Sequence, residues 1–209
     1  MRLALHAFLT LDGVMQAPGG PREDTSGGFT HGGWLPDHAD EESGAAVVDW
    51  FSNADAFLLG RTTYEIFSGH WPRVTDESDP IASALNGLPK YVASTTLTSL
   101  GWDGAQLLEG DVAAAVTELK KQPGRELQVH GSAGLARTLI EHDLVDEYRL
   151  VLFPLHLGTG KKLFADGAPP ARLRLLSSRT TARGLIITTY EPAGPVTYGS
   201  FALDDEPTP

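Results

Sequence analysis

The stretch LLGRTTYE, Leu58–Glu65, decides how this chain is interpreted. The apolar run Ala56–Leu59 predicts a buried strand, and it stops at Gly60. Arg61 and two hydroxyl residues follow, and the spacing of apolar residues then becomes helical. A surface loop needs neither the glycine nor the fixed charge, whereas an anion held at the end of a sheet would use both.

Two further predicted strands end in a similar way. KYVAS is followed by Thr95-Thr96, and ELQVHG leads into Gly131–Gly134. In a parallel α/β sheet such carboxyl ends share one edge, where ligands bind. Each end taken alone is weak, because most such glycines only permit a turn and most such arginines lie on the surface. None of them has the G-x-G-x-x-G or P-loop spacing.

Strands alternate with helices through the first two thirds of the chain, which predicts a mainly parallel α/β sheet. A hairpin near the end of the chain adds antiparallel edge strands. We expect one domain over residues 1–193 and a weakly held tail over 194–209. The Gly- and Pro-rich loop 16–36 is typical of a functional lid or a disordered segment. The expected strands are 2–10, 56–59, 90–94, 105–110, 126–131, 144–154 and two within 171–192, and the expected helices are 39–53, 62–67, 81–88, 111–122 and 132–143.

Composition excludes several classes of function. The chain has 209 residues and a formal net charge of −11, which disfavours non-specific nucleic-acid binding. It has no cysteine, so a disulfide, a thiolate nucleophile and a cysteine metal site are excluded. No apolar run is long enough for a membrane span, and the first residues are typical of a strand, not a signal peptide. We therefore expect a cytoplasmic protein, and the spacing of the seven histidines predicts no metal site.

The order of the motifs resembles a known family. LLGRTTYE resembles the GR-x-T-(W/Y)-E segment of dihydrofolate reductases, and GHWP, LPKYVASTTL and VHGSAGLARTLIEHDLVDEYRLVLFPLHLGTGKKLF follow in the same order. The chain resembles the dihydrofolate-reductase-like family over about residues 2–191. That family includes the reductase domain of bacterial riboflavin-biosynthesis deaminase-reductases. The resemblance implies a twisted, mostly parallel sheet with helices on both faces, which binds NADPH across its edge.

The resemblance also implies roles for single residues on the cofactor side. Gly60, Arg61 and Thr62 would meet the adenosine side of NADPH, with the Thr63 hydroxyl nearby. Ser94 and Thr95 match the place that touches the 2′-phosphate, although relatives often have arginine where Thr95 stands. The pyrophosphate loop matches Gly131, Ser132, Ala133, Gly134 and Leu135.

The substrate side is less determined. Asp12-Gly13 is either a turn pair or the place where Asp12 orients substrate and delivers a proton, which hydride transfer to C=N or C=O requires. Gly158 and Gly160 could close the pocket from the other side or serve as turn residues. Trp34 belongs to a set of aromatic residues, with Trp50, Trp71 and Phe153, that could form a wall of the pocket or lie in the core.

We therefore expect an NADPH-dependent reductase that acts on a small cyclic imine, carbonyl or ribose-type substrate. The alternative is a nucleotide-binding dimeric module of the same fold without turnover. The resemblance suggests a homodimer, and the apolar stretch GLIITTYEP, residues 184–192, is expected to be an edge strand.

Overall fold

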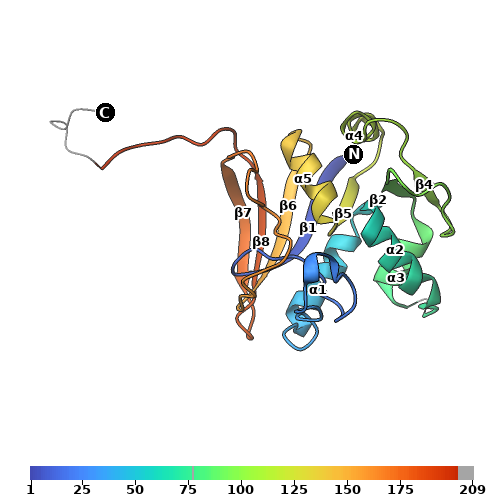
Figure 1. The fold of residues 1–209 in the computed structure, drawn as a ribbon, viewed down its shortest axis with the longest axis horizontal. Helices are drawn as coiled ribbons and strands as arrows, with labels where there is room; N and C mark the ends of the chain where they lie inside the picture. Colours follow the sequence, from blue (N-terminus) through green and yellow to red (C-terminus); the bar gives the residue numbers. More distant parts are fainter. Residues whose placement is uncertain (77, 202–209) are drawn as a thin grey trace.

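The computed structural model describes residues 1–76 and 78–201. Its sheet has eight strands in the order β4-β3-β2-β5-β1-β6-β8-β7, with β7 at one edge and β4 at the other (Figure 1). The strands are β1 (Arg2–Thr10), β2 (Ala54–Gly60), β3 (Lys90–Ala93), β4 (Ala105–Leu107), β5 (Glu126–His130), β6 (Glu147–Phe153), β7 (Leu173–Thr180) and β8 (Ile186–Pro192). The helices are α1 (Glu41–Phe51), α2 (Arg61–His70), α3 (Pro80–Gly87), α4 (Val112–Lys121) and α5 (Ala133–Glu141), with 3-10 turns η1 (Ser26–Gly28) and η2 (Trp71–Arg73).

Every pair of neighbouring strands from β4 to β6 is parallel, and β8 and β7 add antiparallel pairs. This arrangement confirms the predicted α/β class with its C-terminal antiparallel hairpin. The prediction of the edge strand was wrong. GLIITTYEP forms β8, which is paired on both sides, and β7 is the edge. After β6 the chain first forms β7 at the edge of the sheet, and the hairpin then leads back to β8, which lies between β6 and β7.

Helices cover both faces of the sheet. Leu3 and Leu5 point to one face and pack with apolar residues of α4 and α5. Phe57 and Leu59 point to the other face and pack with α1, α2 and α3. The parallel strands are apolar on both sides for this reason, which made them recognisable as continuous runs.

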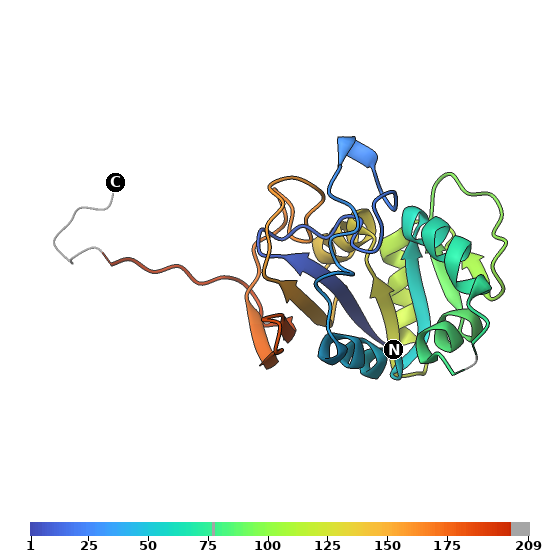
Figure 2. The same cartoon turned by 90° about the horizontal axis from the view of Figure 1, so that it is seen from below.

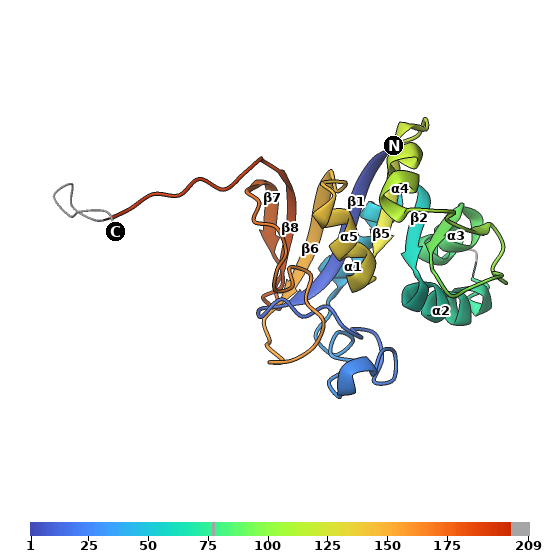
Figure 3. The ribbon, with the colours of Figure 1, turned by 45° about the horizontal axis from the view of Figure 1, so that its top comes forward.

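The loops after β1 and β6 lie on the same side of the sheet, beyond the carboxyl ends of the parallel strands (Figures 2 and 3). A bridge between Val14 and Lys162 joins the two loops. The loop after β1 is closed by hydrogen bonds: the Gln16 side-chain amide donates to the carbonyls of Asp24 and Ser26 at 3.1 and 3.0 Å. Lys161, in the loop after β6, donates its amide to Gln16 Oε1 and its ammonium group to Asp24, so loop 16–36 is also bonded to the loop after β6.

The chain leaves the sheet after β8. Residues 194–201 extend away from the domain (Figure 1), and Tyr198 and Phe201 are exposed. The remainder of the expected tail, 202–209, lies outside the described residues. Within the described part of the chain, no helix combines the length and the apolarity that crossing a membrane requires.

Candidate active site

A cleft of about 770 Å³ opens at the carboxyl ends of β1, β2, β3 and β5. Three strand-end loops that lie far apart in the sequence meet there. All of the residues predicted to bind cofactor line this cleft: Gly60, Arg61, Thr62, Thr63, Ser94, Thr95, Gly131, Ser132, Ala133, Gly134 and Leu135.

Gly60 ends β2 because a side chain would not fit there. A Cβ atom at this position would lie 2.8 Å from the Ser132 hydroxyl oxygen and 2.9 Å from the Ser132 Cβ. The Gly60 amide donates to that hydroxyl oxygen at 2.9 Å, and the hydroxyl donates to Thr63 Oγ1 at 2.6 Å. The loops after β2 and β5 are therefore bonded to each other through one serine.

The turn from β5 into α5 uses two left-handed residues in succession, Gly131 (φ +76°) and Ser132 (φ +63°). For a residue with a side chain this conformation is strained, and such strain concentrates at functional sites. Nothing lies within 4 Å of where a Cβ of Gly134 would be, so the first turn of α5 is open on that side. Free amides at a helix start suit a phosphate.

Arg61 begins α2, and its side chain is half exposed. Among the described residues it forms an ion pair with Glu65, at 3.5 Å one turn further along the helix, and surface pairs of this kind contribute little. The guanidinium can therefore turn to a ligand at small cost. The Ser94 hydroxyl oxygen accepts from the amides of Thr96 and Leu97, and Thr95 is exposed beside it.

The predicted substrate residues Asp12, Trp34, Gly158 and Gly160 are not among the described residues that line the cleft. The Asp12 carboxylate accepts from the Thr10 hydroxyl at 2.5 Å and from the amides of Leu157 and Gly158. The hydrogen bond from Thr10 is the main reason why the pKa of Asp12 is lowered to about 2. Asp12 joins the turn after β1 to the loop after β6, and its catalytic role stays a prediction.

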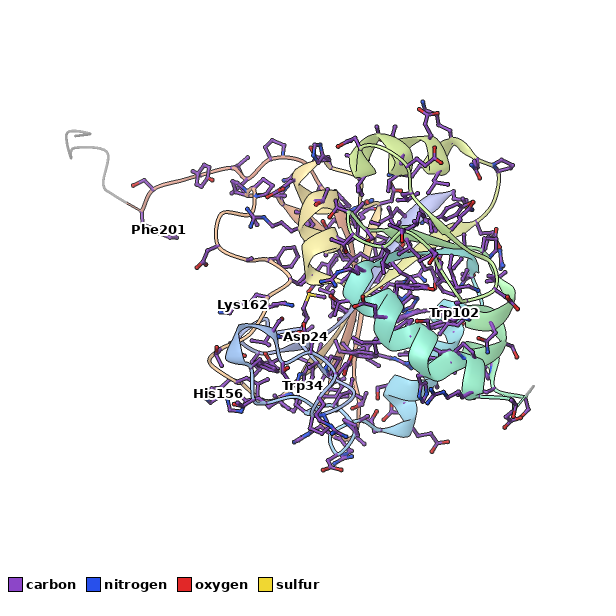
Figure 4. The ribbon with its side chains drawn as sticks, turned by 45° about the vertical axis from the view of Figure 1, so that its right-hand side comes forward. Asp24, Trp34, Trp102, His156, Lys162 and Phe201 are labelled. Carbon is purple, nitrogen blue, oxygen red and sulfur yellow. The ribbon has the colours of Figure 1, made fainter. Side chains whose placement is uncertain are left out.

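Gly160 and Trp34 also support the loops after β1 and β6, from outside the cleft. A Cβ at Gly160, where φ is +118°, would lie 2.7 Å from Val14 and 2.8 Å from Phe29. Trp34 is buried; its indole N–H donates to the Gln16 carbonyl at 2.9 Å, and its ring packs edge-on against Phe153. In the view of Figure 4, Asp24, Trp34, His156 and Lys162 lie on one side of the molecule and Trp102 lies on the other.

Sequence reasoning missed several charged residues of the cleft. Glu23, Asp24 and Lys161 line it. Partial burial raises the pKa of Glu23, whose carboxylate accepts from the amides of Gly19 and Gly20. Partial burial acts to raise the pKa of Asp24, but the hydrogen bonds from Lys161 (2.6 Å) and Ser26 together with the Lys161 charge outweigh burial, and the pKa of Asp24 is lowered. No pattern in the sequence predicts where an acidic residue of a Gly- and Pro-rich loop lies in the fold.

Two histidines form the base of the cleft on the α1 side. His6 of β1 and His130 of β5 are paired in register, with ring centroids 4.3 Å apart. Burial is the main cause that lowers the pKa of His130 to about 3 and the pKa of His6 well below its usual value, and Arg149 acts in the same direction on both. Both rings are therefore neutral at pH 7. Among the described residues, no group of three His, Asp or Glu side chains is placed to hold a metal.

Comparison with known proteins agrees with this geometry. Residues 2–187 match the model of the RibD C-terminal domain family. The Bacillus subtilis (strain 168) protein YyaP is 28% identical over 195 residues, which are 90% of this chain and 94% of that protein. The structure of a candidate riboflavin biosynthesis protein from Shewanella sp. PV-4 superposes with a TM-score of 0.69 at 21% identity, covering 92% of this chain and 99% of that one.

A second solved structure is that of a diaminohydroxyphosphoribosylaminopyrimidine deaminase/5-amino-6-(5-phosphoribosylamino)uracil reductase from Thermotoga maritima. It has a TM-score of 0.59 and 13% identity, and the match covers 92% of this chain and 56% of that one. At these identities the two solved structures show the fold that the chains share.

Proposed function

The chain belongs to the RibD C-terminal domain family, and we propose that it is an NADPH-dependent reductase that transfers hydride to a small cyclic imine, carbonyl or ribose-type substrate. The observation that carries the proposal is the meeting of three strand-end loops, those after β2, β3 and β5, in one cleft of about 770 Å³. Membership of this family, and the reductase activity in the name of the Thermotoga maritima protein, favour an oxidoreductase over other functions of the fold.

The residues present fit a dinucleotide that carries a phosphate. Open space in front of Gly134 and the left-handed turn at Gly131 leave the start of α5 free for the pyrophosphate. Arg61 supplies a positive charge for the adenosine 2′-phosphate, and Ser94 and Thr95 supply hydroxyls beside it. When bound, NADPH would supply the hydride. The residues of this chain would hold the cofactor, and apolar side chains that include Phe8, Val47 and Phe51 line the cleft beside it.

The experiment is a titration of the purified chain with NADPH, followed by fluorescence, and then nicotinamide-oxidation assays with pterin and pyrimidine substrates. We expect micromolar or tighter NADPH binding and turnover of at least one ring compound. Binding without turnover across the panel would favour the alternative, a non-catalytic nucleotide-binding module. The absence of NADPH binding would refute both.

We also propose that the chain is a homodimer, joined through the edge strand β7. Nearly all of β7 is exposed, including Leu175 and Leu176 at 50% and 44%. An exposed apolar edge invites pairing with another strand. A second copy would cover it by the same strand in a twofold arrangement. Light scattering should give twice the 22.3 kDa chain mass, and a monomer at micromolar concentration would contradict the proposal.

A further inference from the structure

The C-terminal segment carries two aromatic residues that the domain leaves uncovered. Residues 194–201, called here the arm, extend from the end of β8 past the edge strand β7 and away from the sheet, and the three ribbon views agree on this (Figures 1, 2 and 3). Tyr198 has an exposed fraction of 83%, and Phe201 is fully exposed. Aromatic side chains contribute much free energy when they are buried, so two of them on an extended arm indicate a surface that covers them.

The start of the arm is bonded to the beginning of β7. The Ala193 amide donates to the Arg172 carbonyl at 2.7 Å, and the Arg172 amide donates to the Gly194 carbonyl at 2.9 Å. The Arg172 guanidinium donates to the Ala193 carbonyl as well, at 2.8 Å. The arm therefore leaves the sheet beside the residue that precedes β7, one strand in from the edge.

The opposite end of the β7–β8 hairpin, residues 179–186, is called here the hairpin end. Arg179 and Arg183 are exposed there. Arg179 donates to the Glu42 carbonyl at 3.1 Å, and Arg183 donates to two carbonyls of the segment before α1, at 2.6 and 2.7 Å. The Glu42 carboxylate accepts instead from the Ala182 amide. Neither arginine forms an ion pair within the described part of the chain, so both charges are available to an acidic partner.

The homodimer proposed above would place the arm of one copy at the hairpin end of the other. The two β7 strands of a twofold pair run antiparallel, so the start of each lies beside the end of the other. From β8 across both β7 strands to the β8 of the other copy is three strand spacings, or about 14 Å. Residues 195–201 span about 23 Å when extended, which is enough to reach that strand. The arm also points away from its own domain (Figure 1).

The residue types at the C-terminus complement those of the hairpin end. Ile186 begins β8 and has an exposed fraction of 38%, so it offers an apolar contact to the aromatic residues of the arm. The sequence continues beyond the arm with Asp204, Asp205 and Glu206, which lie outside the described residues. Acidic residues that follow two aromatic residues suit a surface with an apolar side chain and two arginines.

We propose that two copies of this chain exchange arms across the β7 edge. Tyr198 and Phe201 cover the partner's Ile186. The acidic residues that follow them pair with the partner's Arg179 and the partner's Arg183. The exchanged arms add apolar and charged contact area to the pairing of the two β7 strands. The inference rests on the proposed homodimer and is independent of the proposed reductase activity.

The first test uses the absence of cysteine from the chain. Phe201→Cys and Ile186→Cys are made on two differently tagged copies, which are co-expressed and then treated with oxidised glutathione. We expect a disulfide between the two copies. The matched control combines Phe201→Cys with Val48→Cys, which replaces an apolar residue of α1 with a similar exposed fraction of 36%, and it should not form a disulfide.

Two results of this test would overturn the proposal. One is equal linking of the two pairs of copies, or no linking in either. The other comes from a chain that carries both Phe201→Cys and Ile186→Cys and is mixed with an excess of wild type. A disulfide that forms within that chain would show that the arm folds back onto its own hairpin end.

The second test measures the dissociation constant of the dimer by analytical ultracentrifugation. A chain that ends at Pro195 should dimerise at least tenfold more weakly than the full chain, and Tyr198→Ser combined with Phe201→Ser should reproduce most of that loss. Thr197→Ala, a change at an exposed residue of the same arm, is the control and should have no effect. An unchanged dissociation constant in the shortened chain would overturn the exchange of arms.

The third test concerns the charges. Replacing Asp204, Asp205 and Glu206 by the corresponding amides should weaken the dimer at low ionic strength, and the difference from the wild type should shrink at high ionic strength. The control makes the same change of net charge at three exposed acidic residues outside the hairpin, which are Asp49, Glu109 and Glu118. The control dimer should be as strong as the wild type or stronger, because copies of net charge −11 repel each other. Equal effects of the two triple changes would overturn the pairing with the arginines.

The outcomes separate this inference from the proposals made above. A full chain that stays monomeric at micromolar concentration refutes the homodimer and the exchange of arms together. A dimer that is equally strong without the arm leaves the homodimer and refutes the exchange. NADPH affinity should be equal in the full and the shortened chain, because the described residues of the arm do not line the cleft. A failure to bind NADPH therefore refutes the reductase proposal and leaves the exchange of arms standing.

Discussion

The two halves of the cleft are built in different ways. The half that we propose for the cofactor, called the cofactor half, consists of short loops directly after β2, β3 and β5, and it offers backbone amides, hydroxyls and the half-exposed Arg61. The half that we propose for the substrate, called the substrate half, consists of side chains from β1, α1 and the loops after β1 and β6, and its polar groups range from the buried His6 to the exposed Lys161. Backbone amides at a strand end bind any phosphate, whereas a buried side chain selects one shape. We therefore expect the first half to be general and the second half to be specific.

The largest effect should come from the junction that holds the cofactor half together. In Gly60→Ala the new methyl group would lie under 3 Å from Ser132, whose own backbone is strained, so both loops must shift. We expect a loss of about 1 to 3 kcal/mol in the free energy of unfolding, with weaker NADPH binding. Urea denaturation and NADPH titration measure the two effects.

Gly134→Ala is the matched control for this junction, because its Cβ would meet nothing within 4 Å in the free protein. Alanine also has the better helix propensity, so stability should be unchanged or slightly higher. Equal stability losses in the two variants would mean that the contact between Gly60 and Ser132 is not what holds the loops.

The next effect tests whether the cofactor half distinguishes phosphates by charge. A 2′-phosphate is nearly a dianion at pH 7. Arg61→Ala should weaken NADPH binding by roughly ten- to a hundred-fold and leave NADH binding almost unchanged, since a charge-assisted hydrogen bond contributes ~1.5 to 3 kcal/mol. Fluorescence titration with both cofactors measures this.

Arg137→Ala removes an arginine that has the same kind of ion pair, with Glu141 one turn along α5, but does not line the cleft. It should change neither affinity. If Arg61→Ala weakens NADPH binding and NADH binding equally, Arg61 supports the loop and does not bind the 2′-phosphate.

These two halves also differ in how far the sequence predicts them. The strands and the three strand ends were predictable because each depends on neighbouring residues: a buried apolar run followed by glycine or hydroxyl residues. The edge position of β7 was not, because the order in which strands join a sheet depends on contacts far along the chain. His6, Glu23 and Lys161 were missed for the same reason. His6 looks like one more residue of a buried strand until the register with β5 places it beside His130.

A third prediction uses pH to probe the buried half. The folded protein keeps His6 neutral, whereas the unfolded chain binds a proton at a pKa near 6.5. The unfolded state therefore takes up more protons below that value, and stability is lost as the pH falls. At pH 5 the loss from one such histidine is at most about 2 kcal/mol.

Denaturation at pH 7 and pH 5 checks this prediction. His6→Leu should lose up to about 2 kcal/mol less than the wild type between the two values, and His142→Leu, the same change at the exposed residue that follows α5, should behave as the wild type does. The groups that face His6 are His130, which is also neutral, and Arg149, whose charge opposes protonation. If the wild type and His6→Leu lose equal stability, water reaches His6 in the folded protein.

The smallest effect concerns Asp12, which belongs to neither half but joins the two long loops of the substrate half. In Asp12→Asn the side-chain NH₂ would replace one of the oxygens that accept from Thr10 and the amides of Leu157 and Gly158, so one bond is lost. We expect about 1 kcal/mol less stability and unchanged NADPH affinity.

If Asp12 orients the substrate or supplies the proton, turnover should also fall. Because its pKa is about 2, Asp12 carries no proton at neutral pH, whereas Glu23 borders the cleft with a raised pKa. Comparing the turnover of Asp12→Asn with that of Glu23→Gln decides between them. Normal turnover in Asp12→Asn together with reduced turnover in Glu23→Gln would mean that Asp12 only supports the loops and that Glu23 is the acid.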